Sequence, residues 1–479
     1  MNDRRPPVPE PAAPPGAVAP GRRGSRSGRA GALAAVLLGV GRLFSAEEAP
    51  PNFVIILADD LGYGDLGCYG HPRHRTPHLD RLAADGLRFT DFHSNGPMCS
   101  PTRAALMTGL YPSRFGRNME TALSNRDDRN AGLPLAAVTI AEALRERGYA
   151  TGAFGKWHLG YEPPFVPTRQ GFDEFRGLLS GDGDHHTHRD RGGRPDWWHN
   201  EKPVTEHGYT AELLTRHSID FIERNQSRPF LLYLAHLAIH FPWQGPRDPP
   251  HRTEPRDYES EKWGVIPDPA NVAPHVQAMV ESLDASVGAV MAALRRLQLE
   301  GRTLVFFTSD NGGYLNYGPN YLNISSNGPL RGQKTELYEG GHRVPAIAWW
   351  PGRIAPGTTA ATALGFDLFP TLLNLAGAPR RPNDGADLAP LLFGGRPLAD
   401  RTLFWRAGPR QAVRRGPWKL VQQGEGPPQL FNLAEDVGES RDLAAREPVR
   451  VADLRAALSR WEKDVDQSAR AFQGAASSP

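Results

Sequence analysis

The chain contains three continuous apolar runs, and each of them passes directly into polar residues. The runs lie at 52–58, 229–235 and 303–308. A run of strand-favouring apolar residues without alternation is typical of a strand buried on both faces of a parallel sheet. Helical periodicity lies between the runs, at 139–147 and 275–297. Strands that alternate with helices predict an α/β fold with a large, mostly parallel central sheet flanked by helices.

The pattern changes near residue 380, where the apolar runs become shorter. These strand-like runs lie at 402–406, 411–414, 418–422 and 429–433. With the helical pattern that follows at 448–465, they predict a smaller C-terminal antiparallel sheet with a packing helix. We therefore predict a main domain at 50–378 and a C-terminal subdomain at 379–479. Because no linker of disordered composition separates them, we expect the two to pack together.

The first 46 residues have the order of a signal peptide. A Pro-, Gly- and Arg-rich stretch precedes an apolar run at 30–40, and small residues surround Ser45-Ala46. The apolar run is shorter than the ~20 residues that span a bilayer, so the pattern favours export and cleavage over anchoring. The Arg22-Arg23 pair hints at twin-arginine export, although the full motif does not follow it. A disordered tail is the alternative; export predicts a periplasmic or extracellular protein without stable membrane insertion.

The charge balance and the cysteine content narrow the range of partners. Lys and Arg total 55 against 53 Asp and Glu, so there is no reason to expect nucleic acid as a partner. The 51 Gly and 45 Pro residues indicate many loops, as in an enzyme. With Cys68 and Cys99 as the two cysteines, no disulfide framework holds the fold. A bond between them is the alternative, and it would block chemistry at Cys99.

Polar pairs follow two of the predicted strands. Asp59-Asp60 comes directly after the first run, and Asp310-Asn311 comes shortly after the third. Ligands of open α/β sheets bind beyond the carboxyl ends of the strands, so we expect these pairs to converge. Their oxygens suit one Ca²⁺ ion, with Mg²⁺ less favoured. Since Asp is also common in turns and caps, solvated turns are the alternative.

A distinctive segment begins at Cys99. It reads Cys99-Ser-Pro-Thr-Arg103, with Thr-Gly109 following the arginine; the cysteine heads a short turn, and an apparent helix follows. A helix N-terminus would place unpaired amides and positive dipole beside the sulfur. On spacing alone the cysteine is a small buried residue, a reactive thiolate or a residue that an enzyme modifies, and the first is the common case. The full pattern resembles the sulfatase family signature Cys-x-Pro-Ser/Thr-Arg, in which the cysteine becomes formylglycine (3-oxoalanine).

Other segments are similar to the same family, in the expected order, across roughly 50–440. A segment at 148–160 holds Lys156 and His158 and looks like the second family signature. His240 precedes Phe-Pro, and Lys334 lies in the family-like segment 330–341. The runs Trp-Lys-Leu-Val at 418–421 and Leu-Phe-Asn-Leu at 430–433 resemble the small subdomain of the family.

The resemblance implies an alkaline-phosphatase-like fold and the hydrolysis of sulfate esters through a formylglycine at position 99. The hydrated aldehyde has two hydroxyls: one attacks sulfur and displaces the alcohol, and the other lets the sulfated enzyme intermediate collapse with loss of sulfate. A formylglycine-generating maturation enzyme is implied as a partner. The implied metal ligands are Asp59, Asp60, Cys99, Asp310 and Asn311.

The resemblance also implies a role for each cation of these motifs. Arg103 would hold the diol oxygens, Lys156 would bridge sulfate and diol, and His158 would take the proton as sulfate leaves. His240 and Lys334 would face the bridging oxygen of the substrate, one of them as general acid. Taken singly, such residues are more often surface cations or core histidines. Their occurrence in family order favours the site for all of them, but not for a further histidine, His236.

The segment 180–188 needs a separate interpretation because it carries His185, His186 and His188. Clustered histidines can bind transition metals. We favour a loop at the mouth of the site, with Ser180 near the sulfate as a further substrate-binding residue. The Trp197-Trp198 pair either stacks on a sugar or packs beneath that loop.

We therefore expect an exported sulfatase that acts on a sulfated carbohydrate, or on simple aryl sulfates. One alternative is a phosphodiesterase or phosphonate monoester hydrolase of the same superfamily, which could share the metal site. Another is a sulfated-glycan-binding protein that has lost turnover. Intact Cys99, Pro101 and Arg103 argue against a binding protein, which needs no aldehyde precursor.

Overall fold

The computed structural model describes residues 49–124, 126–258 and 271–476. The predicted signal segment lies outside these residues. Both cysteines are free thiols.

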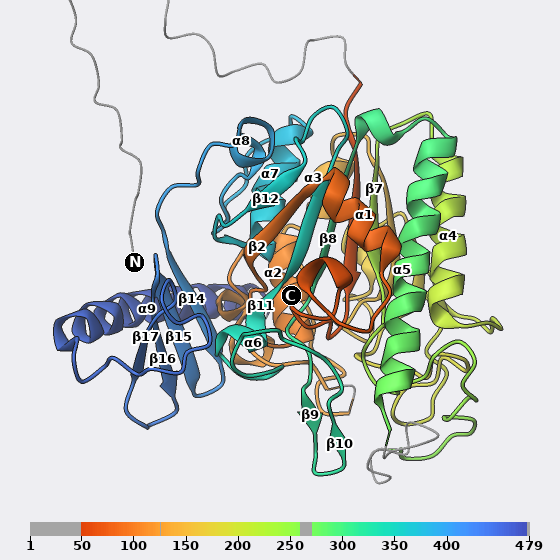
Figure 1. Ribbon diagram of the computed structural model, residues 1–479. Helices are drawn as coiled ribbons and strands as arrows, with labels where there is room; N and C mark the ends of the chain where they lie inside the picture. The colour runs from red at the N-terminus through yellow and green to blue at the C-terminus, as the bar shows by residue number, and fades with distance from the viewer. Residues whose placement is uncertain (1–48, 125, 259–270, 477–479) are drawn as a thin grey trace, which may run out of the picture. The chain divides into compact units, whose positions relative to one another are not determined.

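An eleven-stranded sheet forms the centre of residues 49–479 (Figure 1). Its central strand, β1 (Asn52–Ala58), runs parallel to β7 (Phe230–Ala235) and β8 (Thr303–Ser309), and β3 (Ala150–Lys156) extends the parallel part beyond β7. Every residue of β1, β7 and β8 is buried, as the continuous apolar runs predict. The predicted α/β fold with a large, mostly parallel sheet is confirmed.

The outer strands complete this sheet with some antiparallel pairing. β11 (Arg343–Trp349) runs antiparallel to both β8 and β2 (Leu87–His93), and β4 (Glu174–Leu178) is parallel to β3. The remaining strands are β5 (Trp198–His199), β6 (Lys202–Pro203), β12 (Gly357–Thr359) and β13 (Ala363–Leu364). A separate short hairpin is formed by β9 (Asn316–Tyr317) and β10 (Tyr321–Leu322).

Helices cover both faces of the sheet. The long helices α4 (Thr210–Arg224) and α5 (Ala273–Arg296) share one apolar core with α1 (Pro77–Asp85) and with alternate residues of β1, β7 and β8. On the other face, α2 (Cys99–Thr108), α3 (Ile140–Arg145) and α7 (Leu368–Leu375) pack together (Figure 1). Two short helices are α6 (Glu339–His342) and α8 (Ala389–Gly394).

The C-terminal part forms its own antiparallel sheet, as predicted. Its strands are β14 (Thr402–Ala407), β15 (Arg410–Arg415), β16 (Trp418–Gln423) and β17 (Gln429–Asn432). The helix α9 (Pro448–Ala476), longer than its sequence pattern indicates, packs on this sheet, with the Trp461 ring stacked 5.0 Å from that of Phe404.

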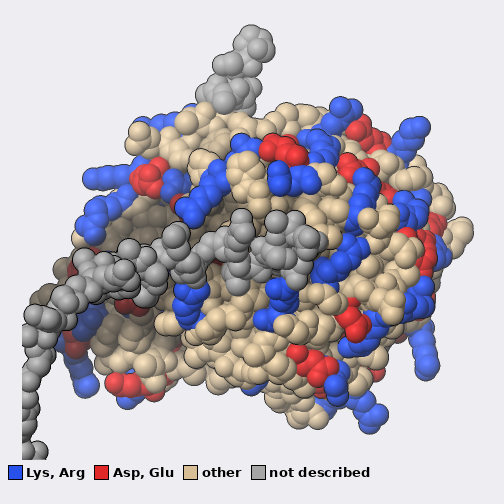
Figure 2. Space-filling model, turned by 90° about the horizontal axis from the view of Figure 1, so that it is seen from above, with Lys and Arg blue, Asp and Glu red and all other residues tan. Residues whose placement is uncertain are grey.

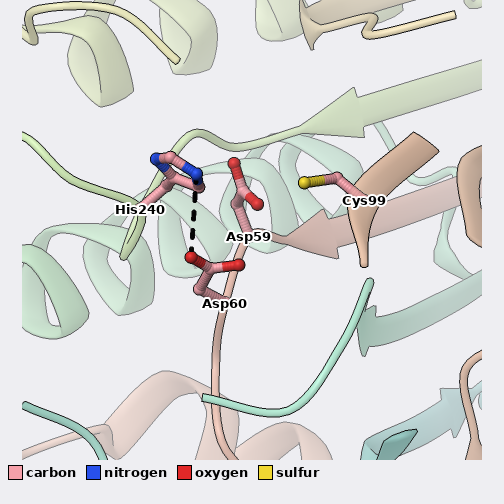
Figure 3. A group of neighbouring side chains, drawn as sticks. All are labelled: Asp59, Asp60, Cys99 and His240. Atoms are coloured by element: carbon pink, nitrogen blue, oxygen red, sulfur yellow. Dashed lines mark ion pairs between the residues drawn. The ribbon is translucent and has the colours of Figure 1, made fainter. Parts of the chain in front are cut away.

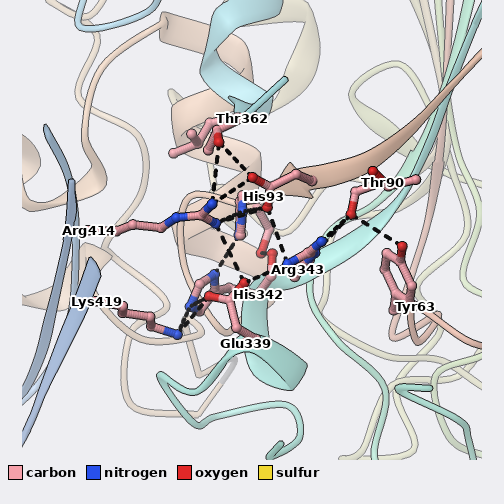
Figure 4. Close-up of polar contacts among 12 residues, drawn as sticks. Tyr63, Thr90, His93, Glu339, His342, Arg343, Thr362, Arg414 and Lys419 are labelled. Carbon is pink, nitrogen blue, oxygen red and sulfur yellow. Dashed lines mark hydrogen bonds and ion pairs between the residues drawn. The ribbon is translucent and has the colours of Figure 1, made fainter. Parts of the chain in front are cut away.

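A buried polar network joins this small sheet to the main one (Figure 4), and we call it the closed network. Its six members are Asp91, His93, Glu339, His342, Arg414 and Lys419. The Nζ of Lys419 lies 3.1 Å from His342 Nε2, and His342 Nδ1 lies 3.0 Å from His93 Nδ1. At the far end, His93 Nε2 lies 2.9 Å from Asp91 Oδ1.

The two histidines of the closed network lie between charged side chains. Lys419 Nζ lies 3.1 Å from His342 Nε2, and Arg414 Nη1 lies 3.0 Å from His93 Nε2. Burial lowers the pKa of each histidine below its ordinary value, which favours the neutral form of both.

The charged surface agrees with the near-neutral composition. Figure 2 shows one face of the protein, on which Lys and Arg side chains lie among Asp and Glu and are separated by uncharged residues.

Candidate active site

The carboxyl ends of the central strands bring the predicted site residues together. Asp59 and Asp60 follow β1, Lys156 ends β3, and Asp310 follows β8. All four are buried. Since β1, β3, β7 and β8 are parallel, these ends lie at one edge of the sheet, where ligands bind in open α/β folds.

Cys99 is the first residue of α2 and reaches the same place. Its Sγ lies 3.7 Å from Lys334 Nζ, and the side chain is buried. The backbone amides of the first helical turn and the helix dipole make this end electropositive. Burial raises the pKa of the Cys99 thiol, while Lys156 and Lys334 oppose that shift. The unmodified thiol is thus held protonated and is a poor nucleophile.

Three buried cations pair with three carboxylates at this edge. Lys156 Nζ lies 2.6 Å from Asp59 Oδ2, and Lys334 Nζ lies 2.5 Å from Asp60 Oδ1. Arg103 donates to Asp310 Oδ2 from two nitrogens, at 3.0 and 2.7 Å, and to the carbonyl of Lys156. Buried charges are stable only when paired in this way. Burial would raise the pKa of Asp310, but Arg103 holds it below its ordinary value.

The pairing leaves a set of acceptor oxygens unused. Asp59 Oδ1, Asp60 Oδ2 and Asn311 Oδ1 are buried and have no hydrogen-bond partner among the described residues. Ligand atoms of Asp59, Asp60, Cys99 and His240 lie within 4.8 Å of one another (Figure 3). Buried oxygens without partners are rare in proteins. This set therefore fits a hard cation such as Ca²⁺, which takes oxygen ligands.

The backbone also turns sharply at this cluster. Asp60 has a φ of 60°, in the left-handed region that is uncommon for residues other than glycine. The backbone amide of Asp60 donates to Asp310 Oδ1 at 3.2 Å. The side-chain amide of Asn311 donates from Nδ2 to Asp60 Oδ1 at 2.8 Å. These two bonds hold the Asp60 carboxylate so that its other oxygen stays available.

His158 presents one ring nitrogen to the site. Its Nε2 lies 2.8 Å from the carbonyl oxygen of Leu123 and donates to it, while Nδ1 is buried without a partner among the described residues. Burial and Lys156 lower the pKa of His158, so the ring is neutral and Nδ1 can accept a proton. A Cβ on Gly181 would lie 2.4 Å from this ring, so only glycine lets the segment after β4 pass so closely.

His240 and Lys334 face each other across the same cavity. His240 Nδ1 donates to the carbonyl of Phe241 at 2.7 Å, and its Nε2 lies 3.8 Å from Asp60 Oδ2. Burial and Lys334 lower the pKa of His240, whereas Asp60 raises the pKa of Lys334 against the opposing effect of burial.

A cavity of about 300 Å³ contains these groups. It is lined by Cys99, His158, His240 and Lys334 from the predicted set. A larger cavity, of about 910 Å³, lies along α4 and α5 and contains none of the predicted site residues. Chemistry rather than size therefore identifies the site.

Some residues that the sequence analysis considered for the site do not line the cavity. Ser180 donates from Oγ to the carbonyl of Asp182. His236 is a core residue, with Nε2 3.0 Å from Ser286 Oγ. The histidines at 185–188 belong to the loop after β4, and Trp197 packs beneath that loop, 4.4 Å from the ring of His188.

The loop after β4 is held from inside by one carboxylate. Asp184 accepts from the amides of His186 and Thr187 at one oxygen and from those of His251 and Arg252 at the other. These bonds hold the pKa of Asp184 below its ordinary value, at about 2, against the effect of burial. The loop is therefore a fixed wall of the cavity.

Sequence reasoning did not single out the residues at the rim. Arg191, Tyr314 and Tyr317 line the cavity together with Phe241. They lie on loops and on the β9–β10 hairpin, outside the quoted motifs, so no sequence pattern marked them.

Comparisons with known proteins agree with this geometry. The family model described as Sulfatase matches residues 51–378. Arylsulfatase A of Homo sapiens is 37% identical over 461 residues, which cover 83% of this chain and 84% of the relative. N-acetylgalactosamine-6-sulfatase of Canis lupus familiaris is 39% identical over 414 residues, covering 81% and 74%. The crystal structure of Ps i-CgsB in complex with k-i-k-neocarrahexaose has a TM-score of 0.76 at 31% identity and covers 88% of this chain and 94% of its own. The chain belongs to the sulfatase family and is an enzyme that hydrolyses sulfate esters.

Proposed function

We propose that this sulfatase releases sulfate from a sulfated carbohydrate, with Cys99 converted to formylglycine and one Ca²⁺ ion beside it. The observation that carries the proposal is the set of unpartnered, buried oxygens on Asp59, Asp60 and Asn311 next to the Cys99 side chain. A catalytic centre that lacks its ligands is expected to have such unsatisfied groups.

Four side chains would hold the ion, namely those of Asp59, Asp60, Asp310 and Asn311, with residue 99 as a further ligand. All are hard oxygen donors once residue 99 carries a hydrated aldehyde. When bound, Ca²⁺ would offset the negative charge that develops on the sulfuryl oxygens.

The fixed cations around residue 99 would orient the reacting groups. Arg103 is locked by Asp310 and by the carbonyl of Lys156, so its guanidinium can hold an oxygen of residue 99 without reorganisation. Lys156, at the end of β3, would bind both the sulfate and residue 99. His158 would take a proton at Nδ1, the nitrogen that has no partner among the described residues.

The leaving oxygen of the substrate must receive a proton. Lys334 and His240 both line the cavity and can reach a group bound at Cys99. Because the pKa of Lys334 is raised and that of His240 is lowered, Lys334 is the group that carries a proton in the resting enzyme. We assign it as the general acid, with His240 binding the same oxygen.

A carbohydrate substrate is supported by the comparisons and by the rim of the cavity. The neighbour Ps i-CgsB was crystallised with k-i-k-neocarrahexaose, and a relative is named N-acetylgalactosamine-6-sulfatase. The rings of Tyr314 and Tyr317, both partly exposed, line the cavity and offer apolar surface on which a sugar ring can pack.

We further propose a maturation enzyme that oxidises Cys99 as a partner, and export of the chain. Export rests on the signal-like order of residues 1–46. In the part of the chain that the structure describes, no helix has both the length and the apolar character needed to cross a bilayer.

Mass spectrometry of the tryptic peptide that contains Cys99 tests the proposal, on protein produced together with a formylglycine-generating enzyme. We expect loss of sulfur and two hydrogens and gain of one oxygen at residue 99. Release of sulfate from sulfated galactose should rise with the modified fraction. An unmodified thiol under conditions that mature a control sulfatase, or turnover that does not depend on the modification, would overturn it.

A further inference from the structure

One side of the cavity opening is built from three separate segments that meet at Arg191. The guanidinium carbon of Arg191 lies 4.6 Å from the ring centre of Phe241, which follows His240. Arg191 also forms a side-chain hydrogen bond with Tyr317 of β9. The rings of Phe241 and Tyr317 lie 5.0 Å apart. Contact with two aromatic side chains fixes the position of the guanidinium at the opening.

A carboxylate behind Arg191 completes its support. Arg191 donates from Nε to Asp182 Oδ2 at 2.7 Å, and Arg252 donates to the same oxygen at 3.1 Å. Burial would raise the pKa of Asp182, but the two arginines hold it far below its ordinary value, so it stays ionised. Asp182 thus holds both guanidinium groups through one oxygen.

The two arginines differ in burial. The Arg191 side chain is 35% exposed, whereas that of Arg252 is 2% exposed. Arg252 also donates to the carbonyl of Arg189, so it secures the loop from within. Arg252 thus supports the loop from within, and Arg191 is the more exposed cation and lines the cavity.

Arg191 and the reacting groups share one small cavity. Arg191, Cys99, His240 and Lys334 all line the same space of about 300 Å³, which is at the lower end of the size range of ligand pockets. A sugar unit whose sulfate ester lies at Cys99 therefore has its other substituents, or those of the adjoining unit, near Arg191.

We propose that Arg191 binds a second anionic group of the substrate, carried by the sugar that holds the scissile sulfate or by the adjoining sugar. A guanidinium has five N–H donors in a planar fork, so it can hold Asp182 and contact an anion at the same time. Sulfate and carboxylate groups both match this fork. The inference rests on the proposed function and adds a substrate class to it: carbohydrates with more than one negative charge.

The test compares Arg191→Gln and Arg191→Lys with the mature wild-type enzyme. Sulfate release is measured from galactose monosulfates, from galactose disulfates and from galacturonate sulfates. We expect the wild type to prefer the doubly charged sugars. In Arg191→Gln the ratio of kcat/KM for doubly charged to singly charged sugars should fall about 10- to 100-fold, the size expected for a lost hydrogen bond to a charged group. Arg191→Lys should retain part of the ratio.

A matched control is Arg194→Gln, in the same loop, where Arg194 pairs with Asp190 and does not line the cavity. Its ratio should equal that of the wild type. Arms with disulfates and with galacturonate sulfates show whether the second anion is a sulfate or a carboxylate. Equal losses on singly and doubly charged sugars in Arg191→Gln, or no preference in the wild type, would overturn the role of Arg191. Absence of sulfate release from every sugar by the mature wild type would instead overturn the proposed function.

Discussion

This fold contains two buried clusters of charged side chains, and they differ in how their polar atoms are satisfied. In the closed network no buried side-chain nitrogen or oxygen of the six members lacks a partner. At the active site, oxygens of Asp59, Asp60 and Asn311 and the Nδ1 of His158 lack one among the described residues. Both clusters contain histidine and carboxylate groups at distances that could suit a metal.

The difference separates a structural cluster from a catalytic one. Lys419 lies 3.1 Å from His342 and 2.9 Å from Glu339, so a cation already sits among the groups that could hold a metal there. The active site also has left-handed backbone at Asp60 and His158, whereas no member of the closed network does. Strain and unsatisfied polar groups together indicate a site that is built for ligands.

Replacing Cys99 should have the largest effect, and it should change catalysis but not stability. Cys99→Ala should lower sulfate release by more than about 10⁴-fold, because the nucleophile is removed. Thermal unfolding followed by circular dichroism should be nearly unchanged, since the side chain is small. Cys68→Ala is the matched control and should keep its activity, because Cys68 is not among the residues that line the cavity. Rates like those of the wild type in Cys99→Ala would contradict the mechanism.

Replacing Lys419 should lower the stability of the protein, because it removes a cation from the closed network. Lys419→Met leaves Glu339 buried without its nearest cation, which is 2.9 Å away, so we expect a loss of about 3–5 kcal/mol in the free energy of unfolding. Denaturant titration measures it. Arg415→Gln, which breaks an exposed pair with Asp453, should cost less than about 1 kcal/mol. Similar losses in both variants would show that the closed network has no special role.

The two groups proposed for the leaving oxygen should respond differently to the leaving group. Lys334→Ala should lose about 100-fold more activity on a sugar sulfate than on 4-nitrophenyl sulfate, because a poor leaving group needs the proton. His240→Ala should lose more on the sugar sulfate too, but by a smaller factor. Kinetics of kcat/KM on both substrates measure this, and equal losses on the two esters would remove the acid role from the variant concerned.

Ca²⁺ should stabilise the protein through the active site and not through the closed network. Ca²⁺ at about 100 times its Kd should add about 2.7 kcal/mol to the free energy of unfolding, and a chelator should remove that gain. Lys419→Met should keep the calcium-dependent shift in Tm, and Asp59→Asn should lose most of it. A shift that survives in Asp59→Asn would place the ion elsewhere.

Lowering the pH should reduce the stability of the protein through His93 and His342, and this effect should be smaller than the preceding ones. The pKa values of His93 and His342 are lowered in the folded protein. Below a pH of about 6.5, these two histidines are therefore protonated in the unfolded chain while they stay neutral in the folded protein. Stability is therefore full above that pH and falls as the pH is lowered, by up to about 1.4 kcal/mol per pH unit for each histidine. His342→Gln should flatten this slope between pH 6 and 5, while His207→Gln, at an exposed position, should not.

The centre of the molecule was more predictable from the sequence than its rim. Continuous apolar runs predict buried parallel strands, and a polar residue after such a strand must lie at its carboxyl end, as Asp59 and Asp310 do. Arg191 and Tyr317 lie on a loop and a short hairpin, where no periodicity marks a residue. The closed network joins His93 to a residue 249 positions away, and no local pattern reports such a contact.

The residues assigned from family motifs were less predictable than the central strands and more predictable than the rim of the cavity. The structure places Cys99, His158, His240 and Lys334 on one cavity, while their individual roles remain predictions. Ser180 uses its hydroxyl within its own loop, so the sequence neighbourhood alone did not define which way that side chain turns.

The burial of Cys99 bears on when the proposed oxidation would have to take place. All ten residues of α2 are buried, and Cys99 is 2% exposed. A maturation enzyme of the proposed kind must bind the peptide around residue 99, so it would have to act before this helix is enclosed. Under that proposal, the time between synthesis and folding limits the oxidation of each chain, and a chain that folded first would keep its thiol.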